Sequence, residues 1–246
     1  MALNLVMLGP PGAGKGTQAE RFAREHGIPK VSTGDILREA VHSGSELGRQ
    51  VKAVMDRGEL VGDDLMIGIV RERLSRPDAA GGFVLDGFPR TAAQARALDE
   101  IAASRGPVIC VEIKVPDEEL VRRVRGRRVC EDCGANADAF GKADALPESC
   151  QNTERCRSIG PKWVARSDDS EAVVRERLKI FWRDTRPMVE FYSSRPTFRS
   201  IDGLQTPEQV REALVSAAAS ALGLPAAQLR TLVAQKLSGV IAPRQG

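Results

Sequence analysis

Short runs of apolar and β-branched residues alternate with longer stretches of helical periodicity through most of the 246-residue chain. The run from Val108 to Val115 is nearly all apolar, which is typical of a strand that helices bury on both faces. Strands that alternate with helices predict an α/β fold, here a doubly wound parallel five-stranded sheet with helices on both faces. The five predicted strands are Leu3–Leu8, Lys30–Ser32, Gly82–Asp86, Val108–Val115 and Phe198–Ile201.

Two segments interrupt this alternation and are predicted to be insertions. Residues 33–61 show two short helices, broken at Ser43-Gly44, with no strand between them. Residues 127–163 are rich in Gly, Pro, Cys, Asp and Asn, a composition typical of a loop-rich lobe rather than of a helix. Ligands of doubly wound folds bind beyond the carboxyl ends of the strands, so we expect both insertions at that end of the sheet.

The C-terminal part of the chain predicts two helices. The run from Thr206 to Gln209 combines an N-cap, a first-turn proline and a capping-box glutamine, and Gly223 is expected to end this helix. A second helix is expected from Pro225, so that residues 223–246 form a helical extension without catalytic duty. The apolar stripe of this second helix is Leu229, Leu232, Val233 and Leu237.

Composition is ordinary for a globular protein and argues against two classes of partner. The chain holds 36 Lys and Arg against 33 Asp and Glu, a net charge of +3, and only 4% aromatic residues. Nucleic-acid binders need clustered basic charge and stacking platforms, so no nucleic-acid partner is expected. The longest uncharged stretch, Ala213 to Leu229, contains polar residues and is too short to span a bilayer, so no membrane partner is expected.

The cysteines and the start of the chain indicate the compartment. Five cysteines, an odd number, do not look like the disulfide framework of a secreted protein. One of them, Cys110, lies in an apolar strand and is expected to be a small buried hydrophobe. The first residues form an apolar run without a basic leader or a cleavage site, and we therefore expect a cytoplasmic protein.

A phosphate-binding loop is the strongest chemical signal in the sequence. The run from Gly9 to Thr17, GPPGAGKGT, follows the first predicted strand and precedes a helix. Its spacing is that of a Walker A loop, whose backbone amides cradle phosphate oxygens while the lysine, Lys15, adds a charge. Gly16 stands where a Ser or Thr usually ligates Mg²⁺, and the hydroxyl is displaced to Thr17. A second apolar run ends at Asp86, the arrangement of a carboxylate that organises Mg²⁺ and its waters.

The positions of several arginines favour a phosphoryl-transfer enzyme over a hydrolytic switch protein, which uses the same kind of loop. Arg90 comes shortly after Asp86, next to the expected phosphate site, and others lie within or beside the loop-rich segment. Guanidinium groups match phosphate geometry and offset the negative charge that spreads during phosphoryl transfer. The sequence therefore favours a second, phosphate-bearing substrate. The other arginines are Arg123, Arg127, Arg128, Arg166, Arg175 and Arg177.

Together these features make the chain resemble the adenylate kinase family, in its long-lid bacterial form. The matching motifs lie in the family's order over roughly residues 1–222, and the glycine at position 16 is part of the resemblance. They are the run from Gly9 to Gln18, Ser32-Thr33-Gly34-Asp35-Ile36-Leu37-Arg38, Gly58-Glu59-Leu60-Val61, Asp86-Gly87-Phe88-Pro89-Arg90-Thr91 with Gln94, Gly126-Arg127-Arg128-Val129, and Arg166-Ser167-Asp168-Asp169 with Arg175 and Arg177.

The resemblance implies reversible transfer of the terminal phosphoryl group of Mg-ATP to AMP, giving two ADP. It implies a core of residues 1–32, 62–126 and 164–222, an AMP-binding insertion at 33–61 and a lid at 127–163. The two insertions would close over the substrates and exclude water. No general base is needed, because the AMP phosphate oxygen is already an anion, so catalysis depends on positioning and charge. A monomer is also implied.

The resemblance assigns the site residues to groups. The catalytic residues are Lys15, Arg90, Arg127, Arg166 and Arg177, and Asp86 organises Mg²⁺. The ATP-binding residues are Gly12, Ala13, Gly14, Lys15, Gly16, Thr17, Arg123, Arg127 and Gln205. The AMP-binding residues are Thr33, Arg38, Glu59, Leu60, Val61, Gly87, Phe88, Pro89, Arg90, Gln94, Arg166 and Arg177.

Four cysteines of the expected lid form a candidate metal site. Cys130 and Cys133 make a CxxC pair, and Cys150 and Cys156 follow, a set that can hold a structural Zn²⁺. In the family's metal-bearing lids the second pair is also spaced by two residues, which would place the last ligand at Thr153. Reduced thiols and a lid disulfide are the alternatives.

Three other functions compete with this interpretation. A guanine-nucleotide switch would need an Asn-Lys-x-Asp element, and neither Asn4, Asn136 nor Asn152 stands in one. A zinc-ribbon nucleic-acid module would depend on the cysteines alone, against the mild charge and the few aromatic residues. A pyrimidine nucleoside monophosphate kinase is the nearest enzyme alternative, but those enzymes have short lids.

Overall fold

The central feature of the fold is one parallel sheet. The computed structural model describes residues 2–133, 136–137, 150, 153–166 and 168–229. Five strands lie in the order β2-β3-β1-β4-β7, and every neighbouring pair is parallel, which confirms the predicted α/β class. The strands are β1 (Leu3–Leu8), β2 (Lys30–Ser32), β3 (Gly82–Asp86), β4 (Val108–Lys114) and β7 (Phe198–Asp202). All five predictions are confirmed, although β4 ends one residue earlier than expected and β7 one residue later.

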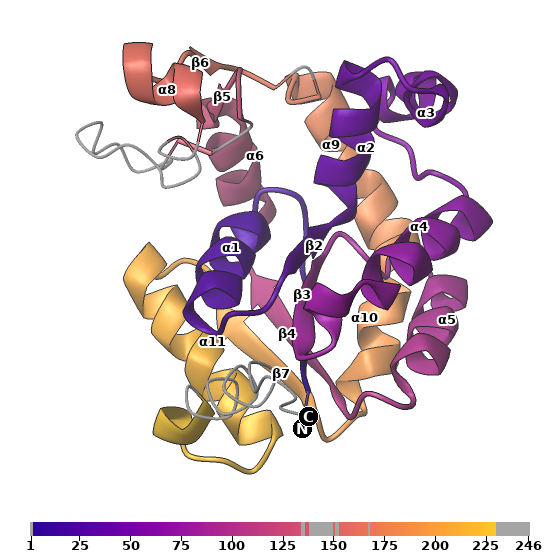
Figure 1. The fold of residues 1–246 in the computed structure, drawn as a ribbon, viewed down its shortest axis with the longest axis vertical. Coiled ribbons are helices and arrows are strands. Elements are labelled where there is room, and N and C mark those ends of the chain that lie inside the picture. Colours follow the sequence, from indigo (N-terminus) through magenta and orange to yellow (C-terminus); the bar gives the residue numbers. More distant parts are fainter. Residues whose placement is uncertain (1, 134–135, 138–149, 151–152, 167, 230–246) are drawn as a thin grey trace, which may run out of the picture.

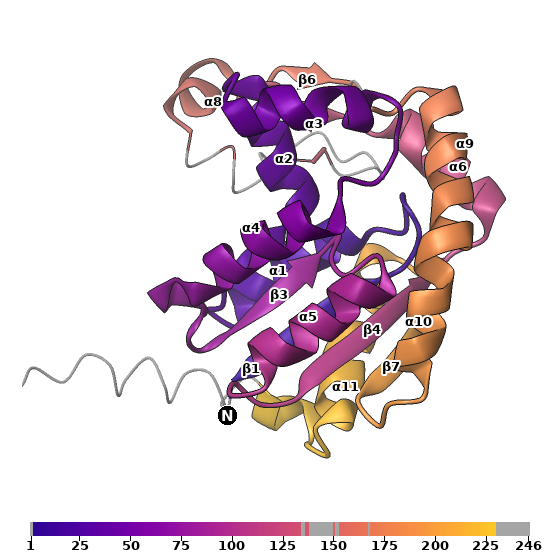
Figure 2. The same ribbon diagram turned by 90° about the vertical axis from the view of Figure 1, so that its right-hand side faces the viewer.

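Helices cover both faces of this sheet. One face packs against α1 (Lys15–Glu25) and α11 (Pro207–Ala221), and the other against α4 (Asp63–Ser75), α5 (Ala92–Ala102) and α10 (Arg186–Ser193) (Figures 1 and 2). Alternate residues of each strand enter opposite clusters, because successive side chains of a strand point to opposite faces. The sheet is therefore buried on both sides, as its apolar strands predict.

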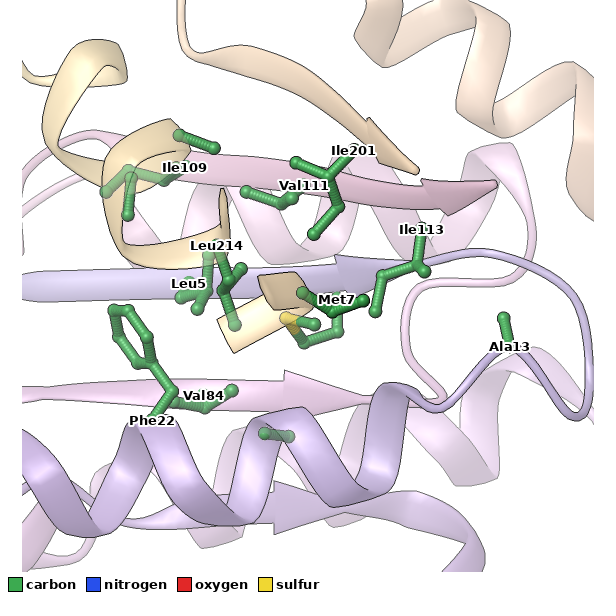
Figure 3. Close-up of a cluster of buried hydrophobic side chains, with 14 of the residues drawn as sticks. Leu5, Met7, Ala13, Phe22, Val84, Ile109, Val111, Ile113, Ile201 and Leu214 are labelled. Atoms are coloured by element: carbon green, nitrogen blue, oxygen red, sulfur yellow. The ribbon is translucent and has the colours of Figure 1, made fainter. Parts of the chain in front are cut away.

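The strand β1 shows this alternation. Leu5 and Met7 belong to the cluster under α1 and α11, whereas Val6 belongs to the cluster under α4, α5 and α10. Figure 3 shows Phe22 of α1 and Leu214 of α11 on the same side of the sheet as Leu5 and Met7. The predicted burial of Cys110 is confirmed, since its side chain is fully buried in β4.

The first insertion consists of α2 (Thr33–His42) and α3 (Glu46–Asp56). Ser32 caps α2 by accepting a hydrogen bond from the Asp35 amide, and Ser45 caps α3 by accepting one from the Gly48 amide. Gly44, between the helices, has a φ of +64°, a left-handed conformation that favours glycine. The two helices and the break between them are as predicted.

The second insertion contains more regular structure than its composition predicts. It follows α6 (Asp117–Gly126) and holds the antiparallel pair β5 (Val129–Cys130) and β6 (Trp163–Val164) with the short helix α8 (Glu154–Ile159). The composition predicts a loop-rich lobe rather than a helix, and the six-residue α8 is a short helix that this prediction does not include. The helix α8 buries Cys156 among the other lid cysteines, a tertiary contact that local periodicity does not reveal. Both insertions stand beyond the same end of the sheet (Figure 2).

The chain then returns to the sheet through a long helical segment. It comprises α9 (Glu171–Ile180), the π-helical turn η2 (Phe181–Thr185) and α10. Elsewhere in the chain, a short 3-10 turn, η1 (Pro77–Ala79), connects α4 to β3. The capping box of Thr206 and Gln209 is formed as predicted, and Gly223, with a φ of +67°, follows α11.

The predicted final helix lies only partly in the described chain. Residues 226–229 are helical, and Leu229 is buried in the cluster under α1 and α11. Leu232, Val233 and Leu237 lie outside the described residues. Among the helices that the structure describes, none is both long and apolar enough to cross a membrane.

Candidate active site

The phosphate loop joins β1 to α1 at the carboxyl end of the sheet. Gly12 and Gly14 have φ values of +87° and +90°, and a Cβ on Gly12 would lie 2.7 Å from Cγ2 of Val124. The loop therefore needs glycine at these positions. No side chain caps the start of α1, so its first amides are available to an anion. The Lys15 ammonium donates to the carbonyl oxygens of Gly9 and Pro10, at 2.7 and 2.8 Å.

Asp86 ends β3 beside this loop and lies close to Gly16. A Cβ on Gly16 would lie 3.2 Å from Oδ2 of Asp86, closer than an ordinary carbon–oxygen contact. A Ser or Thr at this position would crowd the carboxylate. Thr17 carries a hydroxyl one position after Gly16, and it lines the same cavity as the loop.

Three partly buried cations at the site have only neutral hydrogen-bond acceptors. Within the described part of the chain, no carboxylate oxygen lies within 4.0 Å of the charged groups of Lys15, Arg90 or Arg166. Arg90 donates to the Gly87 carbonyl at 2.9 Å, and Arg166 donates to Oδ1 of Asn136 at 3.0 Å. Cations held in this way favour an anionic ligand, because desolvated charge is costly without a counter-charge.

The pKa values of these cations reflect the same surroundings. Burial, opposed by Asp86 and reinforced by the neighbouring arginines, lowers the pKa of Lys15 to about 8. Burial, followed by repulsion from Arg177, lowers the pKa of Arg90 to about 10, and burial with repulsion from Arg127 lowers that of Arg166 to about 10. A negatively charged group that approaches these cations would raise their pKa values again, because an opposite charge favours the charged form.

Three further arginines are oriented by carboxylates. Arg177 donates to Oδ2 of Asp168 at 3.0 Å, and the Arg127 guanidinium pairs with both oxygens of Asp169, with Nε at 2.7 Å. Although burial raises it, the pKa of Asp168 is held below its usual range by Arg177 and other arginines. The third, Arg123, donates to Glu119 at 2.7 Å and to the Gly203 carbonyl at 2.8 Å. These contacts fix the guanidinium positions before any ligand arrives.

All nucleotide-site residues predicted from the sequence line two adjoining cavities. Those in the larger cavity alone are Gly12, Ala13, Gly14, Lys15, Gly16, Thr17, Asp86, Phe88, Pro89, Arg123, Arg127, Arg166 and Gln205. Those in the second cavity alone are Thr33, Glu59, Val61 and Gln94. Those lining both are Arg38, Leu60, Gly87, Arg90 and Arg177.

Some residues lie differently from their motif neighbours. Arg128 and Arg175 are exposed and line neither cavity, and Arg175 pairs with Glu171 instead. Asp168 and Asp169 were assigned no role from the sequence, although both belong to the matched motif that begins at Arg166. The contact between Asn136 and Arg166 could not be predicted from the sequence, because it joins two residues that lie 30 positions apart and no motif connects them.

The lid cysteines form one compact group. The Sγ atoms of Cys130, Cys133, Cys150 and Cys156 all lie within 4.8 Å of one another, with 3.5 Å between Cys130 and Cys156 and 3.4 Å between Cys133 and Cys150. No disulfide joins them. Thr153, where the family's spacing would place the last ligand, is the N-cap residue of α8, and Cys156 supplies the fourth sulfur instead.

The parallel sheet, the phosphate loop and the cation-lined cavities define a P-loop phosphotransferase of the α/β class. The adenylate kinase family model matches residues 7–197, and the chain belongs to the adenylate kinase family. The chain is 46% identical over 210 residues to the adenylate kinase of Archaeoglobus fulgidus, which is 85% of this chain and 94% of that protein.

Two other relatives are similar over most of the chain. The adenylate kinase of Nitrosococcus oceani is 46% identical over 203 residues, covering 82% of this chain and 91% of that protein. The adenylate kinase of Geotalea daltonii is 42% identical over 216 residues, covering 87% of this chain and 98% of that protein. The family match, residues 7–197, spans both insertions.

Proposed function

We propose that this chain transfers the terminal phosphoryl group of Mg-ATP reversibly to AMP and forms two ADP. The observation that carries the proposal is the set of cations without carboxylate partners, Lys15, Arg90 and Arg166, along two adjoining cavities. Two nucleotides with their phosphates facing each other would bring several negative charges to this place. Fixed cations there offset the charge that spreads over the transferring group.

The reaction needs no proton transfer at the attacking atom. An ionised oxygen of the AMP phosphate attacks the γ-phosphorus, the bond from the γ-phosphorus to the β–γ bridging oxygen breaks, and ADP leaves with that oxygen. The chain therefore contributes positioning and charge rather than a general base. The Mg²⁺ that accompanies ATP supplies additional charge compensation on the phosphates.

The larger cavity is the proposed ATP site. The amides from Gly12 to Thr17 and the Lys15 ammonium would hold the donor phosphates. In support, no side chain caps the start of α1, although the Ala13 amide donates to the Pro10 carbonyl at 3.2 Å. Asp86 would organise the waters of Mg²⁺. The arginine Arg127 would bind the donor phosphates, and Arg123 and Gln205 would lie against the donor adenine.

The second cavity is the proposed AMP site. Thr33 and Arg90 both donate to the Gly87 carbonyl, each at 2.9 Å, which joins the start of α2 to the loop after β3. Arg166 and Arg177 would bridge the AMP phosphate and the transferring group. The remaining residues proposed around AMP are Arg38, Glu59, Leu60, Val61, Gly87 and Gln94, which line the second cavity, and Phe88 and Pro89, which line only the larger one.

We propose that residues 33–61 close over AMP and residues 127–163 over ATP, on a core of residues 1–32, 62–126 and 164–222. Support comes from the position of α2, α3 and the β5–β6 pair beyond the carboxyl ends of the strands (Figures 1 and 2). Closure would exclude water, which otherwise accepts the phosphoryl group. Residues 223–246 would be an extension outside the catalytic machinery.

The cysteine group is proposed to hold a structural Zn²⁺. Four thiolates at about 2.3 Å from a tetrahedral ion lie about 3.8 Å apart, and the two shortest Sγ separations here are 3.4 and 3.5 Å. Such an ion would brace the lid and take no part in the chemistry. Metal analysis of protein purified without chelator should find one zinc per chain, and a metal-free chain with four reactive lid thiols would contradict the site.

A monomer in a reducing compartment, the cytoplasm, is proposed as the working form. A single chain carries both cavities and every proposed site residue, so no second copy is needed to complete the site. The five cysteines form no disulfide, which fits a compartment that keeps thiols reduced.

The most direct test is an acceptor survey. Mg-ATP is offered with AMP, CMP, UMP or GMP, and ADP formation is followed through a coupled assay. AMP should be the preferred acceptor by a wide margin. Preference for CMP or UMP would assign the chain to pyrimidine nucleotides, and hydrolysis of ATP without any acceptor would contradict phosphoryl transfer.

A further inference from the structure

The side-chain amide of Gln94 is held from both ends. Gln94 is 2% exposed and lines the second cavity. Its Nε2 donates to Oδ1 of Asp63 at 2.8 Å, and its Oε1 accepts from the Arg90 backbone amide at 2.8 Å. Asp63 itself borders neither cavity, so it can act on a ligand only through another residue.

Asp63 is in turn held in place by Thr91. It is the first residue of α4, and its Oδ2 accepts from the Thr91 hydroxyl at 2.9 Å. Thr91 also caps α5, because its hydroxyl oxygen accepts from the Gln94 amide at 3.2 Å. The starts of α4 and α5 are thus joined by a closed set of hydrogen bonds around one carboxylate.

These partners allow Gln94 only one amide orientation. A carboxylate accepts and a backbone N–H donates, so Asp63 attracts Nε2 and the Arg90 amide attracts Oε1. The flipped amide would place its oxygen against the Asp63 carboxylate and its N–H groups against the Arg90 N–H. Both contacts would then be repulsive, and two buried polar groups would lose their partners.

The fixed amide still has one N–H and one lone pair unused, because an amide carries two of each. A 6-aminopurine base complements this pair, since its 6-amino group donates while its N1 accepts. A 6-oxopurine base has the reverse pattern, because its O6 accepts while its N1–H donates. In the same pose, a 6-oxopurine therefore faces a donor with a donor and an acceptor with an acceptor.

We propose that Asp63 is a positioning residue that makes the acceptor site select 6-aminopurine over 6-oxopurine nucleotides, by fixing the amide orientation of Gln94. This inference rests on the proposed function, which places the acceptor base at Gln94. Selection arises as much from the mismatch with the wrong base as from the match with the right one.

The test compares AMP with IMP, which differ only at the 6-position and N1. Asp63→Asn keeps the shape of the side chain but can donate as well as accept. It therefore removes one of the two contacts that oppose the flipped orientation of Gln94, and only the Arg90 backbone N–H still opposes it. Asp64→Asn is the matched control, since Asp64 lies in the same helical turn, is exposed and has no ion pair within the described chain. For each protein, kcat and KM are measured for both nucleotides, with saturating Mg-ATP.

Asp63→Asn should lower the AMP-to-IMP ratio of kcat/KM by about tenfold or more, the scale of one lost hydrogen bond to a charged partner. The KM for AMP should rise, the KM for IMP should fall, and the KM for ATP should stay within about twofold. Asp64→Asn should leave the ratio within about twofold of wild type. Where IMP turnover is too slow to measure, the ratio of Kd values from calorimetry replaces it.

An unchanged ratio in a folded Asp63→Asn protein would overturn the proposal, and so would equal losses with AMP and IMP, which would indicate a purely structural role. If Asp63→Asn does not fold by circular dichroism, Asp63→Ser provides the same comparison. A wild-type protein that does not use AMP would instead refute the proposed function itself, so the two failures are distinguishable.

Discussion

Removal of the Arg90 side chain should abolish most catalysis and leave the fold intact. Arg90 has one side-chain hydrogen bond, to the Gly87 carbonyl, and no carboxylate partner in the described structure. Loss of that bond costs about 1 kcal/mol. Burial and Arg177, however, lower the pKa of Arg90 to about 10, which means that the folded protein disfavours this charge. We therefore expect Arg90→Ala to change the free energy of unfolding by less than about 1 kcal/mol.

The catalytic loss should be far larger. An arginine that stabilises a transferring phosphoryl group contributes about 10³- to 10⁵-fold in rate, equivalent to about 4–7 kcal/mol of transition-state stabilisation. A coupled assay of ADP formation measures kcat and KM, and thermal unfolding measures stability. Arg90→Lys should lie between wild type and Arg90→Ala, because it keeps the charge but loses the planar fork.

The matched control is Arg175→Ala, which removes an exposed guanidinium paired only with Glu171. It should keep kcat within about twofold of wild type, since surface ion pairs contribute little. A folded Arg90→Ala protein that loses less than about tenfold in kcat would refute the charge-compensation account. A large loss of stability in that variant would show that the role of Arg90 is structural.

Three further predictions follow from the site. The affinity for ATP should fall about tenfold per pH unit above pH 8. Burial lowers the pKa of Lys15 to about 8, and the neutral amine that forms above this pH attracts phosphate weakly. A calorimetric affinity that does not change with pH would contradict this prediction. Cys156→Ser should lose zinc in metal analysis, whereas Cys110→Ser should keep it, and zinc retained in Cys156→Ser would exclude the four-sulfur site. Gly58→Ala should destabilise the fold by about 1–3 kcal/mol, because Gly58 has a φ of +76°. It should also raise the KM for AMP, because a Cβ at this position would lie 2.9 Å from Cγ of Arg177. Unchanged thermal unfolding and kinetics would refute this prediction.

The strands and the phosphate loop were predictable because local sequence encodes them. Buried parallel strands are short apolar runs, and the run from Leu3 to Leu8 needs no partner to be recognised. The start of α11 was predictable for a similar reason. The side chains of Thr206 and Gln209 each accept a hydrogen bond from the other's backbone N–H, within one helical turn.

Tertiary contacts were not predictable in this way. The helix α8 buries Cys156 against the other lid cysteines, a contact between distant segments that its own six residues do not indicate. Arg175 and Arg177 are two positions apart on α9, yet only Arg177 faces the cavities, because residues at this spacing do not share a helix face. The contact of Asp63 with Gln94 joins two helix starts 31 residues apart, and no motif marks it.

The central claim is that one chain holds two nucleotides at once, phosphate to phosphate. The measurement that tests it most directly is a calorimetric titration with two adenosines joined through five phosphates. We predict that one molecule binds per chain, far more tightly than ATP alone, and that it prevents binding of both ATP and AMP. If the compound binds no more tightly than ATP, or leaves AMP binding unchanged, the chain does not bind two nucleotides in this arrangement.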